Sequence, residues 1–146
     1  MLFNSYLRNG IVYVPTVAQL QIGGAYWDIE PVAVEPVANT EGLRRAFSDA
    51  MARKNAIVPN PPKGNWPPPV LLKYAGVKTW SSFARNASQW SIEAEDGIYR
   101  IVGYRDHPDG YWVPDQNQKV QFPPDTAAGD VINRMIAILQ GAARKG

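Results

Sequence analysis

The chain has no cysteine and only one histidine, His107, among its 146 residues. Without cysteine there can be no disulfide bond, no thiol nucleophile and no structural zinc site built on cysteine ligands. No apolar run approaches the roughly 20 residues of a membrane-spanning helix, and the opening residues, MLFNSYLRNG, lack the basic and then apolar pattern of a signal peptide. We therefore expect a cytoplasmic protein without a membrane partner.

Signatures of common enzymes are also missing. The sequence contains no P-loop, no G-x-G-x-x-G and no G-x-S-x-G. His107 lies between Asp106 and Pro108, which is typical of a turn where the aspartate bonds the local backbone. Asp106, Asp109 and Asp115 lack the spacing of a calcium loop. We expect no catalysis, no cofactor and no metal, and a small acid–base enzyme using His107 is kept as a rival hypothesis.

The composition is that of a folded domain. Hydrophobic residues make up 45% and charged residues 19% of the sequence, far from the values of disordered chains. The length corresponds to one domain and is sufficient to bury a hydrophobic core. We expect residues 1–146 to form a single domain.

The first half of the chain predicts two strands and a helix. Residues 11–14 are β-branched and aromatic, and Gly23-Gly24 opens a second run at residues 25–30. The two runs predict an antiparallel pair that turns at residues 21–24. Asn9-Gly10 is a second turn signal, and prolines 15, 31 and 36 indicate bulged or edge strands. Apolar residues at helical spacing predict a helix that begins at Asn39-Thr40 and ends near residue 54.

Residues 59–69, called here the Pro-rich connection, hold six of the thirteen prolines. Such a segment is extended rather than helical. A linker between domains would be polar throughout, whereas Trp66 and the following Val70-Leu71-Leu72 are apolar. We therefore expect an ordered loop that lies against the body of the protein.

The second half predicts a short helix, three strands and a final helix. Thr79 caps the short helix, with Trp80, Phe83, Ala84 and Ala87 facing inward. Residues 90–95 and 98–102 form a hairpin around Asp96-Gly97, and residues 119–122 form a third strand. Asp125-Thr126 caps a helix whose apolar face comprises Val131, Ile132, Met135, Ile136, Leu139, Ala142 and Ala143. The order β-β-α-loop-α-β-β-β-α predicts an α+β fold, with an antiparallel sheet of about five strands and two or three packed helices.

The net charge of +2 conceals two segments of opposite sign. Residues 41–85 carry eight basic and two acidic residues, which gives +6. Together with Trp66, Tyr74, Trp80 and Phe83 they suggest a single-stranded nucleic-acid-binding module, our alternative function. The spacing of Trp80 and Phe83 equally fits core residues beneath an ordinary basic helix face.

Residues 86–130 carry three basic and eight acidic residues, which gives −5. Carboxylates beside tyrosine and tryptophan on a rigid sheet suit the capture of a basic protein, because charge steers the encounter and aromatic residues anchor it. A blocker of a nucleic-acid enzyme needs such a surface, since the enzyme's substrate groove is positive. An acidic face that is merely solvated explains the charge as well. The candidate binding residues are Glu93, Glu95, Asp96, Asp106, Asp109, Tyr111, Trp112 and Asp115.

Most of residues 70–140 resembles one known family. The segments KYAGVKTWSSFARNASQWSIEAEDGIYRIVGYR and DGYWVPDQNQKVQFPPDTAAGDVINRMIAIL are similar to immunity proteins of bacterial contact-dependent growth inhibition systems. The shared features are the GVKTW helix start, the W-S-I strand start, the D-G turn and the closing amphipathic helix.

The resemblance implies a bacterial cytoplasmic protein that binds the C-terminal domain of its cognate toxin, often a nuclease, and neutralises it stoichiometrically. Toxin-contacting residues diverge within this family, so the resemblance assigns no functional residue to this chain. The candidate residues above rest on charge alone.

Overall fold

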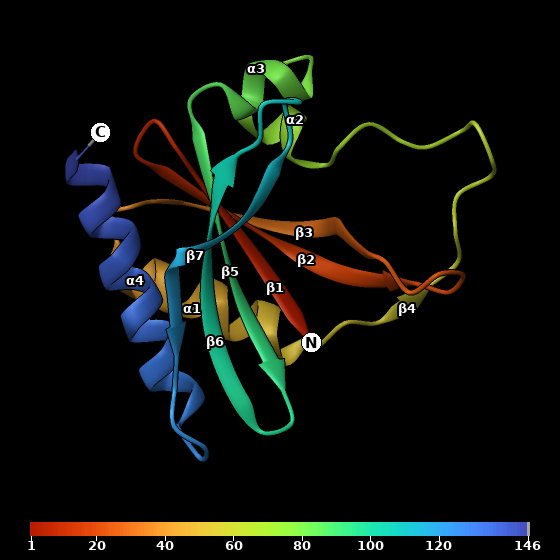
Figure 1. Cartoon of the computed structure of the whole chain (residues 1–146). Coiled ribbons are helices and arrows are strands. Elements are labelled where there is room, and N and C mark those ends of the chain that lie inside the picture. Colours follow the sequence, from red (N-terminus) through yellow and green to blue (C-terminus); the bar gives the residue numbers. More distant parts are fainter. Residues whose placement is uncertain (146) are drawn as a thin grey trace.

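The structure of the chain is a computed structural model, which describes residues 1–145 (Figure 1). Its elements are β1 (Leu2–Arg8), β2 (Ile11–Leu20), β3 (Tyr26–Pro36), α1 (Thr40–Ala52), β4 (Ile57–Val58), α2 (Leu71–Ala75), α3 (Trp80–Ala84), β5 (Ala87–Glu95), β6 (Ile98–Asp106), β7 (Trp112–Gln121) and α4 (Ala128–Lys145). The predicted α+β class is confirmed, with more strands and helices than expected. Nowhere in residues 1–145 is a helix long and apolar enough to cross a membrane.

Six strands form an antiparallel sheet in the order β3-β2-β1-β5-β6-β7, and β4 pairs in parallel with the end of β2. The predicted hairpin is confirmed, because Glu95 pairs with Ile98 across Asp96-Gly97. Both turn residues have positive φ, 54° and 76°, as a tight two-residue turn requires. The predicted antiparallel pair on either side of residues 21–24 is also present, as β2 and β3.

Strand β1, which the sequence pattern did not predict, lies in the middle of the sheet between β2 and β5. The predicted Asn9-Gly10 turn joins it to β2. Its side chains alternate between faces, so Phe3 and Leu7 belong to one hydrophobic cluster and Tyr6 to another. The interspersed Asn4 and Ser5, both buried, mask the apolar pattern that would have indicated a strand.

Helices α1 and α4 cover one face of the sheet and form the main core with it (Figure 1). The predicted start of α1 is confirmed, since the Asn39 side chain accepts a hydrogen bond from the Gly42 backbone N–H at 3.1 Å. The predicted apolar stripe of α4 is buried from Val131 to Leu139.

The predicted cap of α4 is wrong. The helix begins at Ala128, and Thr126 Oγ1 donates to the Pro123 carbonyl at 2.6 Å instead of accepting from the helix. Asp125 has a φ of 67°, so Asp125-Thr126 forms a turn that precedes the helix.

Helices α2 and α3 pack on the opposite face, over Tyr6 and Tyr13. The Thr79 cap of α3 is confirmed by its bond from the Ser82 N–H at 3.1 Å. Phe83 is fully buried and stacks on the half-buried Trp80 with ring centroids 5.2 Å apart, which confirms both as core residues. Helix α2 was not predicted, because it has only five residues and, unlike α3, no polar side chain that caps its start.

The prolines occupy the positions that their missing N–H group allows. Strand β2 continues through Pro15 with a register shift before Thr16, and β3, which holds Pro31 and Pro36, is an edge strand. Strand β7 joins the predicted strand at 119–122 to the preceding segment in one ten-residue strand. A register shift opposite Gly103 makes this continuity possible.

Candidate protein-binding face

Helices α2 and α3 cover only part of the sheet face on which they pack. The rest of this face is called here the polar sheet face. Polar and aromatic side chains from four strands form it, and they either join one hydrogen-bond network or line adjoining cavities. Its members are Asn4, Tyr6, Tyr26, Asp28, Ser91, Glu93, Glu95 and Tyr104.

A hydrogen-bond network connects these strands beneath the surface. The Tyr6 hydroxyl donates to Asp28 Oδ2 at 2.5 Å, and Asn4 Nδ2 donates to Asp28 Oδ1 at 2.8 Å. Ser91 Oγ donates to Asn4 Oδ1 at 2.7 Å and lies 3.2 Å from the Tyr104 hydroxyl. The network spans β3, β1, β5 and β6, and it holds the Asp28 carboxylate in one orientation.

Burial dominates the electrostatics of this network. Desolvation raises the pKa of Asp28, although the hydrogen bonds from Tyr6 and Asn4 oppose the shift. Desolvation, followed by the nearby Asp28 charge, raises the pKa of Tyr6 well above its usual range. No lysine, arginine or histidine within residues 1–145 forms an ion pair with Asp28. Neutral donors alone therefore hold this carboxylate.

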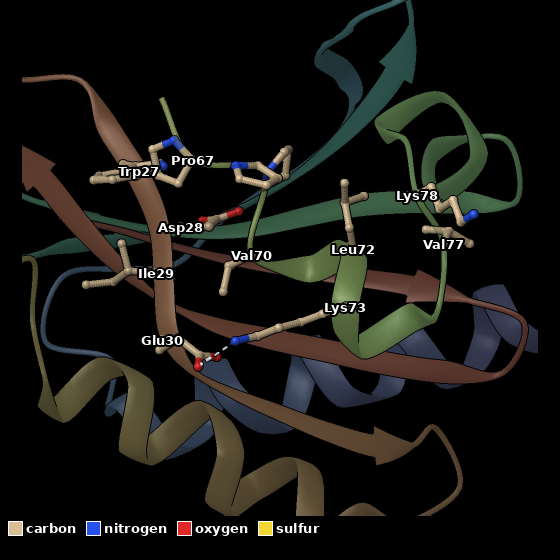
Figure 2. A pocket seen from close by; sticks show the side chains of 12 residues that line it. Trp27, Asp28, Ile29, Glu30, Pro67, Val70, Leu72, Lys73, Val77 and Lys78 are labelled. Atoms are coloured by element: carbon tan, nitrogen blue, oxygen red, sulfur yellow. Dashed lines mark hydrogen bonds and ion pairs between the residues drawn. The ribbon is translucent and has the colours of Figure 1, made fainter. Parts of the chain in front are cut away.

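Two adjoining cavities open beside Asp28. One, of about 390 Å³, has aromatic walls formed by Tyr26, Trp27, Trp66 and Trp80. The other, of about 540 Å³, is lined mainly by apolar residues of β3, the Pro-rich connection and α2. Figure 2 shows Asp28 between Trp27 and Val70 in this second cavity.

The Pro-rich connection forms one wall of both cavities. Trp66 is 52% exposed, yet its ring meets Trp27 edge to face with centroids 5.6 Å apart. An ion pair between Glu30 and Lys73, 3.0 Å apart, joins β3 to α2 at the rim (Figure 2). Hydrogen bonds from Tyr74 and then Lys73 lower the pKa of the exposed Glu30.

The eight predicted binding residues do not form one patch. Glu93 and Glu95 line a further cavity of about 390 Å³ on the polar sheet face, together with Tyr26 and Tyr104, and Asp96 lies in the adjacent exposed turn. Asp106, Asp109, Tyr111 and Trp112 lie at or beyond the far end of β6, and Asp115 lies on β7 a few residues from that end. A strand of nine residues spans about 30 Å, so the acidic segment is divided between two ends of the sheet.

Trp112, a predicted binding residue, is half-buried and packs within the fold. Its ring lies 6.0 Å from that of Tyr6 and 5.7 Å from that of Trp80. Its Nε1 donates to Asp106 Oδ1 at 2.8 Å. The expectation that Asp106 bonds the local backbone is therefore wrong.

The loop between β6 and β7 contains two exposed residues of the predicted set, Asp109 and Tyr111. Tyr111 is 52% exposed and stacks on His107 with ring centroids 4.3 Å apart. The Asp109 N–H donates to His107 Nδ1 at 3.1 Å, which places the histidine in a turn, as expected. Asp115 Oδ1 accepts from the Asn117 N–H at 3.0 Å within β7. Within residues 1–145, no three histidine or acidic side chains are grouped closely enough to hold a metal ion.

Three of the eight basic residues of 41–85 engage different partners at separate places. Lys73 pairs with Glu30, Arg44 pairs with Glu41, and Arg53 donates to Thr16 Oγ1 at 3.3 Å. Phe83 is fully buried in the core, which removes one of the aromatic residues that suggested nucleic-acid binding.

The sequence reasoning missed the central residues of the face, Asn4, Tyr26 and Asp28. For Tyr26 and Asp28, a signal was available in the alternation Tyr26-Asp28-Glu30 along a predicted strand. For Asn4 there was none, because its strand was itself unpredicted.

Comparison with known proteins shows similarity in fold and none in sequence. No known family model and no curated protein matches the chain. A protein of unknown function from Neisseria meningitidis superposes with a TM-score of 0.66 at 13% identity, covering 97% of this chain and 93% of that one. A chain of the CdiA-CT/CdiI toxin and immunity complex from Yersinia pseudotuberculosis superposes with a TM-score of 0.63 at 12% identity, covering 94% of this chain and 95% of that one. The fold of this chain is therefore similar, over nearly its full length, to that of a chain from a toxin–immunity complex.

Proposed function

We propose that this protein is a non-catalytic immunity protein, which binds a contact-dependent growth inhibition toxin domain stoichiometrically in the bacterial cytoplasm. The observation that carries the proposal is the fold match to a chain of the CdiA-CT/CdiI complex, which covers 94% of this chain. The sequence pattern of residues 70–140, which resembles that of such immunity proteins, suggests the same function.

The polar sheet face supports this function as the toxin-contacting surface. It combines the carboxylates of Asp28, Glu93 and Glu95 with the aromatic rings of Tyr26 and Tyr104. Protein interfaces gain most of their affinity from aromatic anchors and their association rate from complementary charge. A toxin that acts on nucleic acid presents basic residues, which an acidic face of this kind complements.

Co-expression tests the function directly. We expect the reading frame immediately upstream to encode a toxin, and its C-terminal domain to arrest growth when expressed alone. Growth should resume when this protein is co-expressed, and the two proteins should co-purify in a 1:1 complex. A toxic domain that this protein neither binds nor neutralises would overturn the proposal, as would an upstream reading frame that encodes no toxin.

Matched charge reversals test the surface. Glu95→Lys and Asp109→Lys make the same change in charge at exposed positions near opposite ends of the sheet. We expect the first variant to associate with the toxin several-fold more slowly and the second to behave as wild type, since rim charges act mainly on association. The reverse result would place the interface at the loop that contains Tyr111.

A further inference from the structure

The cavity between β3, β1, α3 and the Pro-rich connection combines aromatic rings with a carboxylate that burial desolvates. Its walls carry the rings of Tyr26, Trp27, Trp66 and Trp80, and the Asp28 carboxylate lies among them. Its volume of about 390 Å³ is within the range of cavities that enclose a small ligand or one long side chain.

The Asp28 carboxylate retains capacity for another donor. Each oxygen accepts one hydrogen bond, from Tyr6 or from Asn4, whereas an ionised carboxylate has about four acceptor sites. It also has no cationic partner within residues 1–145. A carboxylate largely removed from water without a counter-charge is costly in free energy, and a cation that enters the cavity would relieve that cost.

We propose that this cavity receives an arginine side chain of a protein partner, with the guanidinium group paired to Asp28. The inference rests on the proposed function, which makes the toxin that partner. Arginine suits the cavity better than lysine for two reasons. A guanidinium group stacks on aromatic rings and sheds water more readily than an ammonium group, and its planar fork matches a carboxylate.

Asp28→Asn is the variant that isolates the charge. The side chain keeps its size, and its Oδ1 can still accept from Asn4 while its Nδ2 donates to the Tyr6 hydroxyl, which can act as an acceptor. The network therefore persists, and folding is checked by circular dichroism. Trp66→Ala provides a second variant, because Trp66 is 52% exposed and its removal deletes only one wall.

The experiment uses N-acetyl-arginine amide as the probe and follows the indole N–H signals of the five tryptophans by NMR. We expect saturable shifts at Trp27, Trp66 and Trp80. The signal of Trp90, which packs in the core on the other face, should stay constant. N-acetyl-citrulline amide, which has the same shape but no charge, should bind at least tenfold more weakly. Asp28→Asn should weaken arginine binding at least tenfold, and Trp66→Ala several-fold.

Three results would overturn the inference: equal binding of the citrulline probe, unchanged arginine binding by Asp28→Asn, or tighter binding of N-acetyl-lysine amide. The titration contains no toxin, so its outcome is independent of the co-expression test. If the probe binds as expected but the toxin is not neutralised, the arginine site stands and the proposed function fails. If the toxin is neutralised but no probe binds, the function stands and the arginine site fails.

Discussion

Replacing Trp112 should destabilise the protein without removing a contact to the toxin. Trp112 lies near the exposed loop, yet its ring packs on Tyr6 and Trp80 and its Nε1 donates to Asp106. We expect Trp112→Ala to lower the free energy of unfolding by about 2–3 kcal/mol. The folded fraction of the variant should bind the toxin with wild-type affinity.

The magnitude follows from the contacts that the substitution removes. Each of the two aromatic contacts contributes about 0.5–1.5 kcal/mol, and the hydrogen bond to Asp106 contributes about 1 kcal/mol. Fully buried tryptophans lose about 3–5 kcal/mol on replacement by alanine. Because Trp112 is only half-buried, its loss should fall at or below the lower end of that range.

Urea denaturation and thermal melting followed by circular dichroism measure this loss. For a chain of this length, 2–3 kcal/mol corresponds to a decrease in Tm of about 6–9 °C. Trp112→Phe keeps one aromatic ring but loses the indole donor and part of the packing, so it should cost about 1–2 kcal/mol, less than Trp112→Ala. Tyr111→Ala, at an exposed position of the same loop, should change stability by less than about 0.5 kcal/mol.

An unchanged melting temperature of Trp112→Ala would contradict the structural role of Trp112. If that variant also dissociated from the toxin much faster than the wild type, Trp112 would be a toxin-contacting anchor instead.

Three other measurements test separate parts of the structure. Because the pKa of Asp28 is raised in the folded protein, the wild type should become less stable as pH rises above about 4, the pKa of an aspartate in the unfolded chain. In urea titrations, the stability of Asp28→Asn relative to wild type should therefore increase from pH 4 to pH 7. A difference in stability that does not change with pH would contradict the raised pKa. Gly103→Ala would place a Cβ 2.6 Å from the Trp90 ring. We expect this overpacking to lower the free energy of unfolding, measured in urea, by about 1–3 kcal/mol. An unchanged urea midpoint would mean that the ring moves freely. Trypsin should cut the native protein slowly after Lys63 and the Trp66→Ala variant faster, because the Trp66 ring holds the Pro-rich connection against β3. Rapid cutting of the wild type into two soluble fragments would show that this segment is a linker instead.

Features that depend on neighbours in the chain could be predicted from the sequence. The Asp96-Gly97 hairpin follows from alternation and from two residues that tolerate positive φ. The apolar face of α4 follows from helical spacing, because residues three and four apart share one side of a helix. In both cases the determining interactions lie within about ten residues.

The position of β1 and the composition of the site could not be predicted in this way. Asn4 is buried because β1 pairs with strands on both sides, and a polar residue carries no local sign of that environment. Asp28 becomes a desolvated carboxylate only where β3, β1 and the Pro-rich connection meet.

The acidic segment, residues 86–130, shows most directly which features are local and which depend on the tertiary structure. The sequence by itself determined its charge and the turns that expose Glu95 and Asp109, because composition and turn formation are local properties. Only the tertiary structure decided that the two residues lie near opposite ends of the sheet, since an extended strand carries the chain across the whole molecule between them. The tertiary structure also decided that Glu95 shares a sheet face with Asp28, although the two residues are far apart in the sequence. Strand β1 pairs with both β2 and β5, and this pairing brings the two halves of the sequence together.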